Sequence, residues 1–276
     1  MSGLVLVTGG TGKSGRRLIA QLRDEGIACR AASRGGDPPF DWAQPTTWAA
    51  ALEGVTSIYL VAPTTLSDPY SAMLAFLRSA THQGGRRFVF LSVSPFPAGG
   101  PAHGQVHQWL KDHSEDWTVL RPTWFMQNFS EGQHLPTIRD EAAIYSATGE
   151  GRVPLISADD IARAARAALT HASALNDDFI LTGDEAISYD RVAQLISHAC
   201  GRRISHRAMS AEALTQWQLG RGLPERTAKI LTSLDLAIAA GAEDRTTDAI
   251  EALTGKPPMT FEAFANANAG AWKRAG

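Results

Sequence analysis

The stretch VLVTGGTGKSGRRL, residues 5–18, constrains the fold more than any other part of the chain. An apolar run precedes its glycines, which suits a strand buried on both faces of a parallel sheet. Leu18, Ile19 and Leu22 follow at helical spacing. A strand, a glycine turn and a helix in this order predict a unit whose turn and helix N-terminus bind a phosphate group.

Two phosphate-binding patterns compete for these glycines. The ATP-binding P-loop needs a glycine where the sequence has Val7, inside the expected strand, so that pattern fails. The dinucleotide pattern fits, because its glycines let the backbone turn tightly and approach a pyrophosphate. We therefore predict that the diphosphate of a nicotinamide cofactor contacts Gly9, Thr11, Gly12, Lys13 and Gly15.

The end of the second expected strand, residues 27–34, indicates which cofactor binds. A fold that prefers NAD has an Asp or Glu about 20 residues past the glycines, where it holds the ribose 2′-hydroxyl. Ser33 and Arg34 stand there instead, with Arg34 at 34 − 15 = 19 residues after Gly15. A guanidinium can bind a 2′-phosphate through two hydrogen bonds. The sequence therefore favours NADPH over NADH, with Ser33 and Arg34 as cofactor contacts and Arg30 as an assisting cation.

Strand and helix patterns alternate along the first part of the chain. Strands are expected at 27–34, 55–63, 86–94 and 117–123, and helices at about 70–83 and 102–114. This alternation predicts an α/β fold with a Rossmann-type doubly wound parallel sheet. Further strands are expected at 152–157 and 178–183, a helix at 158–169, and a mostly helical end. We expect an NAD(P)-binding domain over 1–150 and a smaller substrate lobe over 151–276, partly interwoven with it.

Composition narrows the function classes. The formal net charge is −2 and no basic run exceeds two residues, which argues against a nucleic-acid surface. No apolar run approaches membrane length, and the first strand leaves no room for a signal peptide. Cys29 and Cys200 follow no disulfide pattern. We expect a cytoplasmic protein with a small-molecule substrate and no nucleic-acid or membrane partner; a homodimer stays open.

The segments VTGGTGKSGRRL, FVFLSVS, DWTVLRPTWFMQNF and PLISADDIARAARAAL, in this order, resemble the NmrA-like branch of the atypical short-chain dehydrogenases/reductases. Within that branch the chain is similar to the ergot-alkaloid group, which includes agroclavine and festuclavine dehydrogenases and reduces an iminium with NADPH. The resemblance implies that Asp41 and Trp42 flank the adenine. It further implies that the cofactor contacts Val61, Ala62, Pro63, Ser92, Pro122 and Thr123.

The usual proton donor of the wider superfamily is missing. Its enzymes use a Tyr-x-x-x-Lys pair, and none of the four tyrosines here has a lysine four residues on. Anchored on DWTVLRP, the tyrosine position falls near Gly99 and the lysine position near His103. Counted from Ser94, His107 and Lys111 take the two places. His103 and His107 are therefore the catalytic candidates, and without a glutamate between them they predict no metal site.

The missing acid constrains the chemistry. Hydride addition to a carbonyl makes an alkoxide that needs a proton, whereas addition to an iminium carbon leaves a neutral amine. Ring faces of Trp124 and Phe125 can attract a cation, and Ser94 and Asn128 can contact the substrate. We predict an NADPH-dependent reductase of a C=N (iminium), quinone or activated C=C bond in a small aromatic or polycyclic metabolite. A non-catalytic NADP(H)-sensing regulator of the NmrA type stays open, as does a non-redox use of the scaffold such as guiding a cyclisation.

Overall fold

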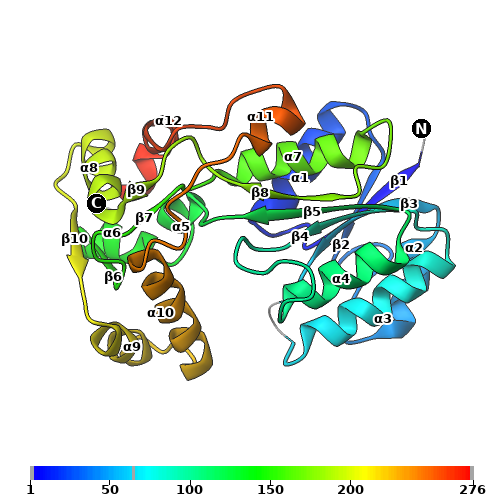
Figure 1. Ribbon diagram of the computed structural model, residues 1–276, viewed down its shortest axis with the longest axis horizontal. Coiled ribbons are helices and arrows are strands. Elements are labelled where there is room, and N and C mark those ends of the chain that lie inside the picture. Colours follow the sequence, from blue (N-terminus) through cyan, green and yellow to red (C-terminus); the bar gives the residue numbers. More distant parts are fainter. Residues whose placement is uncertain (1–2, 64–65, 274–276) are drawn as a thin grey trace. The chain divides into compact units, whose positions relative to one another are not determined.

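The computed structural model describes residues 3–63 and 66–273, and the chain divides into two compact units (Figure 1). The first unit comprises Met1–Pro122, Ala158–Leu181 and Ala249–Lys256; the second comprises Thr123–Ser157, Thr182–Asp248 and Pro257–Gly276. The chain first leaves the sheet unit after Pro122, earlier than the boundary at residue 150 that we expected. It returns twice: Ala158–Leu181 adds a helix and the last strand of the sheet, and Ala249–Lys256 adds another helix.

Six parallel strands form the sheet of the first unit, in the order β2-β1-β3-β4-β5-β8. They are β1 (Leu4–Thr8), β2 (Cys29–Ala32), β3 (Val55–Val61), β4 (Arg87–Leu91), β5 (Asp116–Pro122) and β8 (Asp177–Leu181). The strand order reverses between β1 and β3, and ligands of such sheets bind at the carboxyl ends of the strands beside this reversal. The doubly wound parallel sheet is therefore confirmed.

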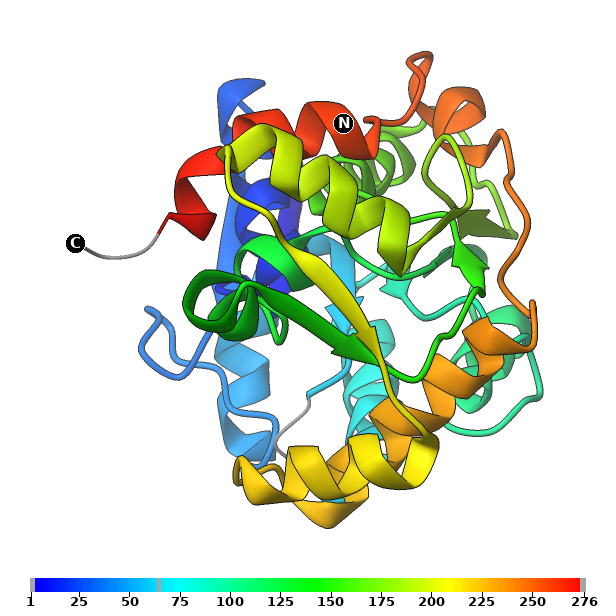
Figure 2. The ribbon, with the colours of Figure 1, turned by 90° about the vertical axis from the view of Figure 1, so that its left-hand side faces the viewer.

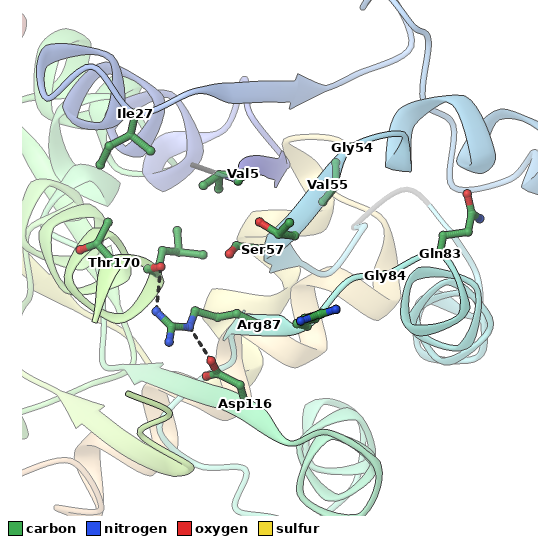
Figure 3. Close-up of a pocket in the computed structure, with 14 residues that line it drawn as sticks. Val5, Ile27, Gly54, Val55, Ser57, Gln83, Gly84, Arg87, Asp116 and Thr170 are labelled. Atoms are coloured by element: carbon green, nitrogen blue, oxygen red, sulfur yellow. Dashed lines mark hydrogen bonds and ion pairs between the residues drawn. The ribbon is translucent and has the colours of Figure 1, made fainter. Parts of the chain in front are cut away.

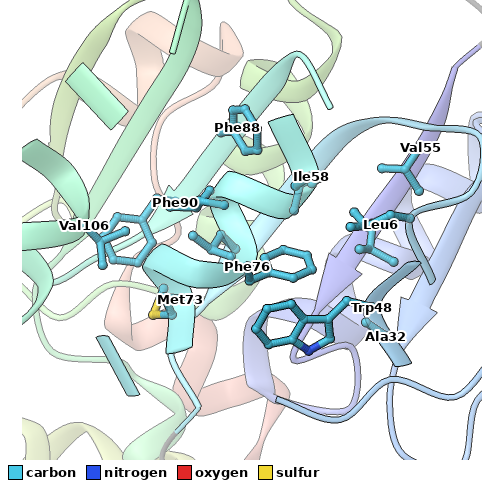
Figure 4. Packing of buried hydrophobic residues seen from close by; sticks show 14 of the residues in the cluster. Leu6, Ala32, Trp48, Val55, Ile58, Met73, Phe76, Phe88, Phe90 and Val106 are labelled. Carbon is cyan, nitrogen blue, oxygen red and sulfur yellow. The ribbon is translucent and has the colours of Figure 1, made fainter. Parts of the chain in front are cut away.

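Helices cover both faces of this sheet. On one face α1 (Lys13–Asp24) packs beside α7 (Ala158–Thr170), which also contacts α11 (Ala249–Thr254). On the other lie η1 (Pro45–Thr47), α2 (Trp48–Leu52), α3 (Pro69–His82) and α4 (His103–His113). Their apolar side chains meet the sheet in a core that includes Phe76, Phe88 and Phe90, all fully buried (Figure 4). Burying such rings stabilises the layer by about 2 kcal/mol each.

The second unit combines short strands with helices. Strand β6 (Ala143–Ser146) pairs in parallel with β10 (Ser205–Ala208), the yellow strand in Figure 2, and β7 (Arg152–Val153) pairs antiparallel with β9 (Ile187–Ser188). The helices are α5 (Gln127–Ser130), α6 (Leu135–Glu141), α8 (Tyr189–Cys200), α9 (Ala211–Gly220), α10 (Glu225–Ala239), α12 (Phe261–Ala267) and η2 (Ala269–Trp272). Ser188, Ser210 and Thr260 cap three of them by accepting a backbone N–H three residues on.

One expected strand is much shorter than predicted. The pattern at 152–157 forms only the two-residue strand β7, after which Pro154 interrupts the ladder because it has no N–H to donate. Beyond it, Ile156 makes a single bridge to Phe125. Among the helices of the described residues, none combines the length and apolar character that crossing a bilayer demands.

Candidate dinucleotide-binding site

The glycine turn between β1 and α1 is closed by its own backbone. Gly9 has a φ of +64°, and its carbonyl oxygen accepts the N–H of Gly12 at 2.8 Å. A Cβ on Gly15 would lie 2.3 Å from that oxygen, and a Cβ on Gly12 would lie 3.1 Å from it. The turn therefore excludes larger side chains at Gly15. Thr11 and Gly12 are exposed to solvent on the outer side of the turn.

The start of α1 suits an anion. Its N-cap residue, Gly12, has no side chain to accept the first N–H groups of the helix, and no acid occurs in the first turn. These N–H groups and the helix dipole give the turn a partial positive charge. These N–H groups, and the absence of side chains at the glycines, fit the diphosphate of a dinucleotide.

Hydrogen bonds attach the turn to β3. The Thr8 hydroxyl donates to the Tyr59 carbonyl oxygen at 3.0 Å and accepts the Val61 N–H at 2.8 Å, and the Tyr59 hydroxyl donates to Ser14 at 3.0 Å. Burial raises the pKa of Tyr59, so this phenol stays protonated. Val61 also underlies the turn, since a Cβ on Gly9 would meet its side chain at 3.2 Å.

The loop after β2 carries the residues predicted to select NADPH. The Ser33 carbonyl oxygen accepts the N–H groups of Gly36 and Phe40, which folds the loop back, and Arg34 is exposed on it. Arg30, which we predicted to assist as a cation, is engaged away from this loop, and its assisting role stays a prediction. Its guanidinium donates to the Ala51 carbonyl oxygen at 2.7 Å and to that of Glu53 at 3.0 Å, so it binds the carbonyl end of α2.

Asp41 and Trp42 follow on the same loop and are held in place. An Asp41 carboxylate oxygen accepts the Ala43 N–H at 2.9 Å, and the Asp41 carbonyl oxygen accepts the Trp48 indole N–H at 2.9 Å. The half-buried Trp42 ring packs edge to face against Phe40 and Phe76, each with ring centroids 5.1 Å away. The loop therefore ends in a fixed aromatic wall.

The ends of β3, β4 and β5 bring further predicted residues to the carboxyl edge of the sheet. Ala62 and Pro63 follow β3 and are half-buried. Ser92 and Ser94 donate their N–H groups to the carbonyl oxygens of Leu120 and Pro122, at 2.8 and 3.0 Å, which extends the pairing of β4 with β5. The Ser92 hydroxyl is buried and has no hydrogen-bond partner among residues 3–63 and 66–273.

His103 starts α4 at the same edge and pairs with a tyrosine that the sequence did not point to. Its Nδ1 lies 3.1 Å from the Tyr70 hydroxyl, and its ring stacks between Phe90 and Phe96. Burial lowers the pKa of His103 to about 4, so the imidazole is neutral at neutral pH. Tyr70 lies near the N-terminus of α3, and no spacing rule connects it with His103; only the fold brings them together.

His107, one helical turn on, lies in different surroundings. Its side chain is nearly fully buried, with its Nε2 3.9 Å from an Asp178 oxygen. Burial lowers the pKa of His107, opposed by the Asp178 charge and assisted by Arg121. Arg121 in turn donates to Asp178 at 2.6 Å and to the Ser94 carbonyl oxygen at 2.6 Å. His107 therefore lies buried beside the Arg121–Asp178 pair, and a catalytic role for it stays a prediction.

Thr123, Trp124, Phe125 and Asn128 belong to the second unit. The Thr123 hydroxyl donates to the Pro154 carbonyl oxygen at 2.5 Å, and the Trp124 carbonyl oxygen accepts the Ile156 N–H at 3.0 Å. The Asn128 N–H donates to the Phe125 carbonyl oxygen at 3.0 Å. Trp124, Phe125 and Asn128 are half-buried, so their side chains retain some access to solvent.

A cavity of about 870 Å³ opens at the opposite, amino edge of the sheet (Figure 3). Val5, Val55, Arg87 and Asp116 line it from the starts of four strands. Arg87 is fully engaged there: it donates to Asp116 at 2.7 Å and to the carbonyl oxygens at 169 and 171. Because the glycine turn lies at the carboxyl ends of the strands, this cavity is not the cofactor site. The described residues contain no group of three or more His, Cys, Asp or Glu that could hold a metal ion.

No family model matches the chain. Among curated proteins it is 41% identical over 275 residues to the uncharacterized oxidoreductase YesF of Bacillus subtilis, covering 97% of this chain and 96% of that one. It is 36% identical over 284 residues to the agroclavine dehydrogenase of Claviceps fusiformis, covering 97% and 98%.

Solved structures share the fold at low sequence identity. An NADPH-dependent quinone oxidoreductase from Escherichia coli, in complex with NADPH, matches with a TM-score of 0.83 and 19% identity, covering 95% of this chain and 99% of that one. The negative transcriptional regulator NmrA, in complex with NADP, matches with a TM-score of 0.73 and 14% identity, covering 96% of this chain and 94% of that one.

The glycine turn and the doubly wound sheet define a Rossmann-type protein with a dinucleotide-binding edge. The full-length relatives narrow this class. The chain belongs to the NmrA-like atypical short-chain dehydrogenases/reductases, together with the agroclavine and festuclavine dehydrogenases, and is an oxidoreductase.

Proposed function

We propose that the protein is an NADPH-dependent reductase that transfers hydride to a C=N (iminium), quinone or activated C=C bond of a small aromatic or polycyclic metabolite. The observation that carries the proposal is the glycine turn, which is closed by its own backbone and leads into the N-terminus of α1 with no side-chain cap. When bound there, NADPH supplies the hydride. The dehydrogenases named above support a redox function, because they match 97–98% of the chain.

We further propose which residues hold this cofactor. Its diphosphate lies on Gly9, Thr11, Gly12, Lys13 and Gly15, and its 2′-phosphate on Ser33 and the exposed Arg34. Asp41 and Trp42 flank the adenine, and Val61, Ala62, Pro63, Ser92, Pro122 and Thr123 contact the rest. The orphaned Ser92 hydroxyl supports this assignment, because a ribose hydroxyl would satisfy it. Ser94, Trp124, Phe125 and Asn128 contact the substrate.

The proton source depends on the acceptor. Reduction of an iminium carbon needs no proton, whereas a quinone oxygen becomes an anion that takes one up. Tyr70 is the phenol placed for that task at the carboxyl edge of the sheet. His103 is held neutral and stacks with two rings; in the tautomer that carries its proton on Nδ1, it donates to the Tyr70 oxygen and stabilises the phenolate that remains. His103 is then a positioning residue rather than the acid.

Titration with NADPH, followed by its spectroscopic consumption with a panel of cyclic iminium ions, quinones and activated alkenes, tests the proposal. We expect tight NADPH binding and turnover with at least one acceptor class. Lack of NADPH binding would end the proposal.

The alternative function is a non-catalytic NADP(H) sensor. The structural similarity to the NmrA regulator favours it, since that protein binds NADP and is named for regulation. A sensor would bind NADPH, oxidise none of it with any acceptor in the panel, and bind a partner protein in a way that depends on the cofactor.

Two smaller proposals accompany this function. Cys29 and Cys200 are free thiols, which supports a cytoplasmic location. A homodimer stays a prediction, and sedimentation or light scattering measures it directly.

A further inference from the structure

The second unit contains a cavity of about 200 Å³ bounded by the start of α6, β6, α9 and α10. Tyr145 and Trp217 form its aromatic wall, with ring centroids 4.7 Å apart. Leu223 and Leu231 add apolar surface. A cavity of this volume holds about one aromatic ring with a short substituent.

Asp235 on α10 contributes a carboxylate to this cavity. Its side chain is only 6% exposed, and one carboxylate oxygen accepts the Ala147 N–H at 2.9 Å. In the part of the chain that the structure describes, no Lys, Arg or His side chain pairs with it. A buried carboxylate without a cation is costly, and desolvation raises the pKa of Asp235 to about 6. The carboxyl group is therefore mostly ionised at neutral pH and retains capacity for a donor.

A second acceptor faces the same space. The side-chain oxygen of Gln218 is buried and has no donor among the described residues. The cation at this cavity, Arg221, is already balanced: it pairs with Glu141 at 2.9 Å and lies over the Trp217 ring. The cavity thus contains a carboxylate without a paired cation and a buried amide oxygen without a donor.

We propose that this cavity binds a small protonated aromatic amine, whose ammonium group donates to Asp235 and Gln218 while its ring contacts Tyr145 and Trp217. Such a ligand supplies the missing donors and the missing positive charge together. The site lies within the second unit alone, so it does not depend on the proposed hydride transfer.

Calorimetry with the full chain and benzylammonium, without NADPH, tests this at about pH 8, where Asp235 is ionised. Benzyl alcohol and benzoate serve as the neutral and anionic probes. We expect benzylammonium to bind about 10-fold more tightly than benzyl alcohol, and benzoate not to bind. Equal affinity for benzylammonium and benzyl alcohol would overturn the proposal.

The Asp235→Asn variant should lose the preference for the ammonium probe. Asp244→Asn is the matched control, because it removes the same charge from an exposed position of the same unit and should change nothing. If Asp235→Asn does not fold, Gln218→Met removes the second acceptor at similar size and should weaken benzylammonium binding by about 3-fold. Unchanged binding in both variants that fold contradicts the assignment.

The pH dependence provides a further check. The charged and titratable groups around Asp235 are His134, Tyr145 and Arg221 in the cavity and Tyr189 on α8. Binding of benzylammonium should weaken as the pH falls through about 6, where Asp235 takes up its proton. This dependence should disappear in Asp235→Asn; its persistence there would assign the effect to His134 and overturn the role of Asp235.

Discussion

The two candidate sites of this protein are built in different ways. The glycine turn of the first unit is made by backbone atoms of one short segment. Its shape requires that certain positions carry no side chain. The Asp235 cavity of the second unit is made by side chains from four elements between residues 133 and 235. Because the glycine turn depends on steric room, a single added side-chain atom should abolish ligand binding there. Because the Asp235 cavity depends on charge, its ligand affinity should change with pH and with isosteric substitutions.

The largest effect is expected for Gly15→Val. Its Cβ would overlap the Gly9 carbonyl oxygen, which forces the turn open and displaces the N–H groups that face the diphosphate. We expect NADPH affinity to fall by more than about 100-fold, measured by fluorescence titration. Gly220→Ala is the control, since a Cβ there meets nothing within 4 Å. An equal loss of NADPH affinity in both variants would show that the glycine turn does not bind the diphosphate.

Tyr70→Phe separates the acceptor classes. The variant keeps the ring but removes the hydroxyl that pairs with His103. We expect quinone reduction to slow by about 100-fold while iminium reduction is spared, because only the first needs a proton. The measurement compares kcat and its pH profile for both acceptors. A structural role alone would lower both rates together, which would remove Tyr70 as the acid.

Arg34→Asp tests whether Arg34, on the loop after β2, selects NADPH over NADH. Placing a carboxylate at the 2′-phosphate should weaken NADPH binding by about 30-fold and spare NADH, as titration with each cofactor would record. Arg78→Asp makes the same change at an exposed position on α3 and should affect neither cofactor. Losses of equal size for NADPH and NADH in the Arg34 variant would assign the recognition of the 2′-phosphate to another residue.

The same contrast explains what could be predicted from the sequence. The glycine spacing and the apolar run before it encode strand, turn and helix locally, so the βα unit and the parallel sheet were predictable. The bonds of Arg30 were not predictable, because its guanidinium binds the Ala51 carbonyl oxygen, 21 residues on, at the end of α2. Tertiary packing alone brings Tyr70 to His103, and it alone gathers the residues that line the Asp235 cavity, so no periodicity in the sequence indicates either group. The paired strands β6 and β10 were missed because each has four residues and their partners lie far apart in the chain.

The smallest expected effect concerns stability in the charge-based site. The folded pKa of Asp235 is raised from 3.8 to about 6, so the folded state keeps a proton that the unfolded chain has already lost between these values. The free energy of unfolding that this group contributes is therefore highest at low pH and is lost as the pH rises through about 6.

Asp235→Asn, which removes the buried charge, should be more stable than the parent by about 1 kcal/mol at about pH 8. The advantage should shrink as the pH falls towards 4. Denaturant unfolding at a series of pH values measures this difference in the free energy of unfolding. A difference that stays constant across the series would mean that Asp235 is not ionised in the folded protein, so that the cavity has no negative charge to attract an ammonium ligand.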